Sequence, residues 1–235
     1  MTTTLGVVLG RSRTALTIIR RKKLFSGSAS SSDNAKIDLS SKTFLLPHRN
    51  LRFEELPDSL LNDLKEHLSD ACKAAEFCHS ALLSCAPSRI SEKNIDEIRL
   101  HAIIQHELRK QLPNSPLEVS IQQVRQSLGS VSTRSSDARR DLIQRFKLSG
   151  TVFDDPQTVS GLQILSESWG VAQYLNKKIM LDELKSGSPD LVSKLRSELL
   201  NKKKLFSSSA GSDAVVINEL LDQEVDKILV KRFQT

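Results

Sequence analysis

The sequence predicts an all-α fold, a bundle of about seven helices that follows a disordered N-terminal presequence. Two observations favour helices. Apolar residues recur at steps of three and four along most of the chain after residue 57, which is helical spacing. The 235 residues include only one Trp and one Tyr, and this scarcity of aromatics disfavours sheet-rich folds. Because the joints between the stripes are short, we expect the helices to pack as one bundle or as paired bundles.

Composition divides the chain into three parts. Residues 1–33 are expected to be a presequence with its cleavage region, and residues 34–56 an irregular arm in which only residues 43–46 favour an extended piece. Residues 57–235 are expected to form the helical domain. A Ser-rich connector near residues 129–136 is a candidate boundary within it.

The presequence prediction rests on charge. Residues 1–32 contain no Asp or Glu, and their basic residues stand among Ser, Thr and small apolar residues. That composition is typical of a mitochondrial transit peptide, so we expect import into mitochondria, to the matrix. A plastid transit peptide has the same character and stays open as an alternative. The residues expected to direct import are Arg11, Arg13, Arg20, Arg21, Lys22 and Lys23.

The net charge of the chain without its presequence gives no support for a nucleic-acid partner. Without residues 1–25 the 34 Lys and Arg fall by six to 28, which equals the 28 Asp and Glu. The rest of the chain is then formally neutral, so its high overall pI is a poor argument for a nucleic-acid partner. No apolar run approaches the roughly 20 residues that a spanning helix needs. We therefore predict no transmembrane segment and leave peripheral membrane contact open.

The first expected helix follows Pro57 and ends before Pro87. Its heptad-like stripe indicates one apolar seam, and the second half of that seam consists of small residues that let a partner helix approach closely. We expect this seam to dock on a larger complex. It comprises Leu61, Leu64, Leu68, Ala71, Ala75, Cys78 and Leu82.

All three cysteines, Cys72, Cys78 and Cys85, fall on this expected helix. Spacings of six and seven residues would put neighbouring sulfurs about 9 to 10 Å apart along the axis, too far for a disulfide within the helix. The spacings also differ from the paired C-x2-C pattern of zinc sites. We therefore expect reduced cysteines that pack as small apolar residues.

Further helices are expected along the rest of the chain. The third begins at a capping box of Ser115 and Glu118, with Pro116 in its first turn. The fourth turns Ala138, Leu142 and Phe146 inward and ends at a glycine. The expected ranges are 91–112, 115–128, 137–148, 155–185, 188–204 and 213–233.

Basic residues gather in the fourth and sixth of these helices. With Leu142 turned inward, Arg140 and Lys147 point to the opposite side. We expect a solvated face, because the chain without its presequence is neutral and nearly lacks aromatics for stacking. Contact with RNA or anionic lipid is the alternative. The candidate contacts for an anion or for RNA are Arg140, Lys147, Lys202, Lys203 and Lys204.

Motifs that would identify a reaction are weak. Glu76 and His79 make the Glu-x-x-His step that di-iron bundles use, but no second copy follows. The nine glycines form neither G-x-G-x-x-G nor G-x-x-x-x-G-K. The sequence therefore predicts no catalytic, cofactor-binding or metal-binding residues and no cofactor.

These observations favour a non-enzymatic mitochondrial protein, a helical subunit or assembly factor that binds a larger protein complex. Two alternatives stay open. The first is a ribosome-associated or RNA-binding protein that uses the basic helices. The second is a metal-dependent enzyme in a helical bundle, built around Glu76 and His79. No stretch of the chain carries a motif specific enough to assign it to a family.

Overall fold

The chain folds as two compact units. Unit 1 comprises residues 1–22 and 38–176, and unit 2 comprises residues 23–37 and 177–235. The structure is a computed structural model. It describes residues 1–10, 12–22, 39–47, 58–73, 75, 77–85, 92–129, 135–153, 158–202 and 221–229.

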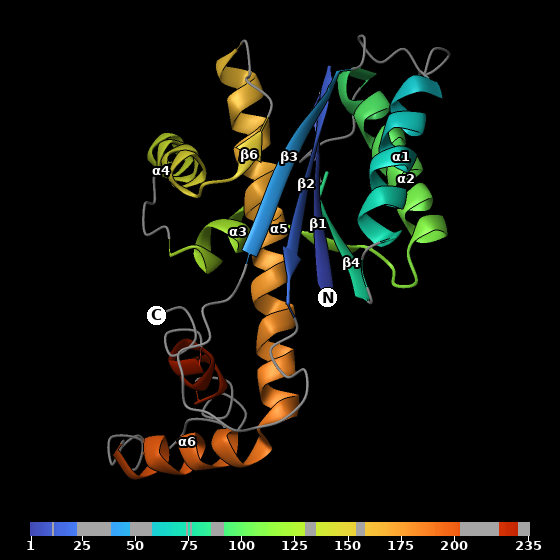
Figure 1. Ribbon diagram of the computed structural model, residues 1–235. Helices are drawn as coiled ribbons and strands as arrows, with labels where there is room; N and C mark the ends of the chain where they lie inside the picture. The colour runs from blue at the N-terminus through green and yellow to red at the C-terminus, as the bar shows by residue number, and fades with distance from the viewer. Residues whose placement is uncertain are drawn as a thin grey trace. The chain divides into compact units, whose positions relative to one another are not determined.

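Unit 1 is built on a six-stranded mixed sheet with the order β5-β4-β1-β2-β3-β6 (Figure 1). Strand β2 is antiparallel to both β1 and β3, whereas β4 is parallel to β1, β5 to β4 and β6 to β3. The fold is therefore α/β, and the all-α prediction is wrong. The strands are β1 Thr2–Leu9, β2 Arg13–Arg21, β3 Leu39–Pro47, β4 Phe77–Leu83, β5 Leu117–Val119 and β6 Val152–Phe153.

Helices cover both faces of this sheet. Helices α1 and α2 lie on one face, and the part of α5 that belongs to unit 1 crosses the other (Figure 1). Helix α5 continues from unit 1 into unit 2. The helices are α1 Asp58–Lys73, α2 Glu92–Gln111, α3 Ile121–Ser127, α4 Ser135–Leu148, α5 Val159–Gly187 and α6 Pro189–Lys202.

The first residues of the chain form the centre of the sheet. Strands β1 and β2 are rich in Thr, Val, Ile and Leu, which favour strands, and the backbone N–H of Gly10 closes their turn by donating to the Arg13 carbonyl at 2.9 Å. Both strands are buried along nearly their whole length. The disorder expected for the N-terminal segment is therefore wrong. Removal of residues 1–25 would take away the two strands that join β4 to β3.

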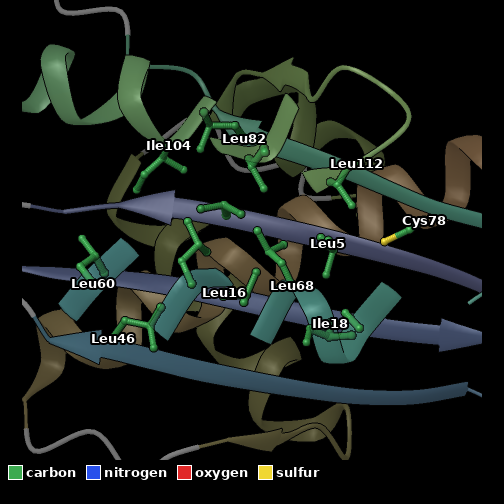
Figure 2. Close-up of a cluster of buried hydrophobic side chains, with 14 of the residues drawn as sticks. Leu5, Leu16, Ile18, Leu46, Leu60, Leu68, Cys78, Leu82, Ile104 and Leu112 are labelled. Atoms are coloured by element: carbon green, nitrogen blue, oxygen red, sulfur yellow. The ribbon is translucent and has the colours of Figure 1, made fainter. Parts of the chain in front are cut away.

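The main core fills the space between the sheet and helices α1 and α2 (Figure 2). Leu5, Leu16 and Leu46 reach it from three strands, and Leu68 and Ile104 reach it from the two helices. All five side chains are almost completely buried. Complete burial stabilises such a side chain by roughly 1.5 to 3 kcal/mol, so this layer holds α1 and α2 to the sheet.

The expected docking seam is this core. Leu64, Leu68 and Ala71 on α1 are fully buried under the sheet, and Leu61 is half-buried. Cys78 and Leu82 belong to β4, because the helix ends at Lys73. Steps of three and four in a heptad and steps of two in a strand both select positions 78 and 82, so the sequence pattern concealed the change from helix to strand.

The expected third helix is also wrong at its start. Residues 117–119 form β5, parallel to β4, and α3 begins only at Ile121. The capping box that forms is Ser120 with Gln123: the Ser120 hydroxyl accepts from the Gln123 N–H at 3.2 Å, and the Gln123 side chain accepts from the Ser120 N–H at 2.8 Å. The Ser115 and Glu118 pair has the same spacing but does not start a helix.

Other expected elements are present. Helices α2, α4 and α6 lie within three residues of the ranges 91–112, 137–148 and 188–204, and α5 begins at Val159 as one unbroken helix. Residues 221–229 are helical within the expected range 213–233. The extended piece expected at residues 43–46 lies within β3.

Unit 2 has its own small core. Met180 and Leu184 of α5, Leu195 of α6, and Val225 and Leu229 are buried together. Two ion pairs accompany them, Lys185 with Asp226 at 2.7 Å and Arg196 with Asp222 at 3.2 Å. Among the described residues of the whole chain, no helix combines the length and the apolar character needed to cross a bilayer.

On the other face of the sheet, α5 approaches β1 so closely that the strand has no side chain at the contact. A Cβ built on Gly6 would collide with the backbone oxygen of Ser168 and would lie 2.5 Å from the backbone nitrogen of Ala172. Ser168 also donates its hydroxyl to the Gly6 carbonyl at 2.8 Å. Helix and strand backbones are therefore in direct contact.

Overpacking a core costs about 1 to 3 kcal/mol. We predict that Gly6→Ala destabilises the protein by at least this amount, because both obstructing atoms belong to backbone that cannot rotate away. Gly10→Ala is the matched control. There the added Cβ would lie 2.7 Å from the tip of the flexible Ile164 side chain, so a smaller loss is expected. Urea unfolding followed by circular dichroism measures both, and equal losses would contradict the proposed contact.

Candidate nucleic-acid interface

Helix α4 is attached to unit 1 by its apolar face. Phe146 packs on Phe153 of β6 and on Trp169 of α5, with ring centroids 4.8 and 6.0 Å apart. Leu142 lies against Gly170, where an added Cβ would be 3.3 Å from its Cδ1. Ala138, Leu142 and Phe146 are all buried, which confirms the inward face expected from the sequence.

A row of hydroxyl groups ties the end of α4 to the edge of the sheet. Ser149 donates to the Phe146 carbonyl at 2.6 Å, and its oxygen lies 2.6 Å from the Thr151 hydroxyl. Thr151 lies 2.7 Å from the Ser41 hydroxyl of β3. Because each hydroxyl has one proton, Thr151 donates to Ser149 and Ser41 donates to Thr151. The row fixes the C-terminal end of α4 relative to β3.

Arg145 joins α4 to the end of α3. Its Nε donates to both carboxylate oxygens of Asp141, at 3.0 and 3.1 Å, and one terminal nitrogen donates to the Leu128 carbonyl at 2.8 Å. This arginine therefore has a structural role. Its charge is already matched by a carboxylate on the same helix.

The outer face of α4 carries basic residues without such partners. Arg140, Gln144 and Lys147 follow one another at steps of four and three, opposite the buried stripe, and all three are exposed. Neither Arg140 nor Lys147 makes an ion pair within the part of the chain that the structure describes. Two unpaired cations therefore project about 10 Å apart along the helix axis. We call Arg140, Gln144 and Lys147 the α4 ridge.

Glu167 of α5 is a partly buried acidic group that interacts with two arginines of this region. Burial raises the pKa of its carboxyl, while a hydrogen bond from Gln163 at 2.9 Å and the charges of Arg139 and Arg125 lower that pKa in part. Arg139 and Arg125 therefore offset a buried carboxylate, whereas Arg140 does not. Sequence reasoning missed this group, because Glu167 and the two arginines come from three different helices.

The other three candidate anion contacts belong to unit 2 or lie outside the described residues. Lys202 is the last residue of α6, in unit 2. Lys203 and Lys204 lie outside the described residues. Of the five candidates, the structure brings together Arg140 and Lys147.

The six basic residues expected to direct import are partly engaged in the fold. Arg13 donates to the Thr158 hydroxyl at 3.0 Å, and Arg20 donates to the Asp70 carbonyl at 3.3 Å. Arg21 is fully buried and donates to the Asn176 side chain at 3.0 Å. Lys22 is exposed, and Arg11 and Lys23 lie outside the described residues.

The histidine of the Glu-x-x-His step is not on a helix. His79 is part of strand β4, and Glu76 lies outside the described residues. Among the residues that the structure describes, no three His, Cys, Asp or Glu side chains gather in a way that could hold a metal ion. The helical-bundle metal site considered from the sequence therefore has no helical scaffold here.

No known family model matches the chain, and no curated protein matches it in sequence. Solved structures do match. A structure of Thermus thermophilus RuvC covers 73% of this chain and 92% of its own, with 12% identity and a TM-score of 0.43. The T. thermophilus RuvC in complex with a Holliday junction substrate covers 73% and 91%, with 10% identity and a TM-score of 0.44. This likeness concerns the fold alone.

The sequence-based prediction of a non-enzymatic helical assembly factor is corrected by these findings. Its docking seam is the core between α1, β4 and the rest of the sheet, so it offers no surface to a partner. Its all-α frame is replaced by an α/β sheet. The argument from Glu76 and His79 assumed a helical bundle, which the structure replaces with a sheet.

Proposed function

We propose that this protein binds structured nucleic acid, with the α4 ridge as its phosphate-contacting surface. The observation that carries the proposal is the pair of exposed cations, Arg140 and Lys147, which make no ion pair with any described residue. A free, rigidly mounted cation pair can neutralise phosphates and release their counterions on binding. The packing of Phe146 and the Ser149 hydroxyl row supply the rigid mounting.

A duplex or branched ligand fits this surface better than a single strand. Single-strand binding relies on exposed aromatic side chains on which bases stack. Here Trp169 is buried, Tyr174 is half-buried, and the exposed Phe77 lies on β4, away from α4. The ridge offers charge without a stacking platform, so it suits the phosphate backbone of a helix. RuvC, which resembles this fold, was solved with a Holliday junction, and that makes a four-way junction a suitable probe.

We predict that replacing both ridge cations, Arg140→Gln with Lys147→Gln, weakens binding to a fluorescent four-way DNA junction and to a linear duplex alike. Each lost phosphate contact lowers the slope of log affinity against log salt by about 0.9 for B-DNA, so the double variant should lose about 1.8. Fluorescence anisotropy from low to physiological salt measures this. Denaturing gels of the same samples read out strand cleavage.

The matched control is Arg109→Gln with Lys110→Gln. It removes the same charges from two exposed positions at the end of α2, which packs on the opposite face of the sheet. Surface changes of this kind alter stability by no more than about 0.5 kcal/mol, so both variants should stay folded. The proposal would be contradicted if the two double variants weakened binding equally. It would also be contradicted if the intact chain bound no nucleic acid at low salt.

We also propose that the N-terminal segment directs mitochondrial import before folding and remains in the folded protein. Its arginines are free to form a cationic face only while the chain is unfolded, because Arg13, Arg20 and Arg21 are hydrogen-bonded in the fold. Removal of residues 1–25 would take away β1 and β2, the centre of the sheet. One segment would thus serve targeting first and packing afterwards.

The chain with a reporter at its C-terminus should therefore enter mitochondria, and mass spectrometry of the imported protein should recover peptides from residues 1–21. Removing residues 1–25 should abolish both import and cooperative unfolding. An imported, folded protein that begins near residue 26 would contradict the proposal, as would exclusive location in the cytosol or in plastids.

A further inference from the structure

Two cysteines meet where helix α1 gives way to strand β4. Cys72 lies in the last turn of α1, and Cys78 is the second residue of β4. Between them, the Ala75 N–H donates to the Cys72 carbonyl at 3.1 Å. The two sulfur atoms are 3.3 Å apart. The separation of about 9 Å expected from one continuous helix is therefore wrong, because α1 ends at Lys73 and Cys78 lies in strand β4.

We propose that Cys72 and Cys78 form a reversible disulfide by exchange with a small-molecule disulfide such as oxidised glutathione. A disulfide requires the sulfurs to approach by about 1.3 Å, from 3.3 Å to the bonded distance of about 2.05 Å. Cys72 is half-exposed and Cys78 is buried. The Cys72 thiol is therefore accessible to a reagent, and the Cys78 thiol lies next to it. This inference stands independently of the nucleic-acid proposal.

The exchange proceeds in two balanced steps. The Cys72 thiolate attacks one sulfur of glutathione disulfide, whose sulfur–sulfur bond breaks and releases the first glutathione thiolate. The Cys78 thiolate then attacks the Cys72 sulfur and releases the second. The protons of the two protein thiols end on the two glutathione thiolates. Two protein thiols are oxidised, and one glutathione disulfide is reduced.

The second step should be the slow one. Burial raises the pKa of the Cys78 thiol, and the hydrogen bond and charge of Cys72 raise that pKa further. At neutral pH little of Cys78 is therefore thiolate, which is the form that attacks. Below that pKa the thiolate fraction grows tenfold per pH unit, so closure should accelerate by about a hundredfold between pH 7 and pH 9.

The disulfide would act on the centre of the fold. Cys78 pairs with Thr3 in the parallel register of β4 and β1, and it belongs to the core between the sheet and α1 (Figure 2). Cys72 packs against the same core from the end of α1. The bond would therefore fasten the end of α1 to the strand beside β1. The bond should reduce local fraying at the end of α1, and its formation should need no large rearrangement of the fold.

In the test, the full chain is incubated in buffers with defined concentrations of reduced and oxidised glutathione. The reaction is quenched with acid, and the free thiols are alkylated with a maleimide after denaturation. Intact mass should show three alkylated thiols under reducing conditions. Under oxidising conditions one alkylated thiol and no bound glutathione should remain, and dithiothreitol should restore all three. Peptide mapping should place the bond between residues 72 and 78, and closure should quicken with pH as stated.

Cys85→Ala is the matched control, because Cys85 is the remaining thiol and is half-buried like Cys72. It should still form the bond. Cys78→Ala should stop at a glutathione adduct on Cys72. Cys72→Ser, at a half-exposed position, should form neither bond nor adduct at these two sites. Three free thiols in every buffer, or a bond that includes Cys85 or links two chains, would overturn the proposal.

Discussion

The contact between helix α5 and strand β1 is the constraint on which unit 1 depends. Gly6 leaves room for the helix backbone, and a buried row of hydroxyls continues the contact across the sheet. Ser168 donates to the Gly6 carbonyl, and Thr17 lies 2.9 Å from both the Ser168 and the Thr43 hydroxyls. With one proton on each hydroxyl, Thr43 donates to Thr17 and Thr17 to Ser168. The row crosses β3, β2 and β1, and it therefore fixes the position of α5 on the sheet.

The surface chemistry of α4 follows from this position. Trp169 and Gly170 are the next two residues of α5 after Ser168, and they receive Phe146 and Leu142 of α4. The helix that carries Arg140 and Lys147 is therefore held by the residues adjacent to the sheet contact. A change at Gly6 should move the ridge as well as weaken the core. The buried polar row also gives α5 a unique register, which apolar packing alone would specify less well.

Sequence reasoning found the elements whose residues repeat with one clear period. Helix α4 shows a helical stripe at Ala138, Leu142 and Phe146, and the structure buries these three residues. Strands β1 and β2 were missed because they are buried on both faces, so no alternation marks them, and their basic, acid-free composition is that of a targeting segment. The signal that could have found them is two Thr, Val and Ile runs joined by a short turn at Gly10.

The candidate site was predictable only in part, for a related reason. The outward direction of Arg140 and Lys147 follows from periodicity within α4 and needed no tertiary information. The role of Arg145, by contrast, depends on the Leu128 carbonyl, and that of Arg139 on Glu167. The two sulfurs at 72 and 78 came together because α1 ends at Lys73, a boundary that no Gly or Pro marks.

The central claim is that residues 1–21 supply the two middle strands of the sheet. Hydrogen exchange of the full chain, followed by mass spectrometry, tests it most directly. Amides of β1 and β2 should exchange only when the whole of unit 1 unfolds, so their protection should fall together with the stability measured in denaturant. Exchange of these amides within seconds in native buffer, as in a disordered leader, would contradict the account.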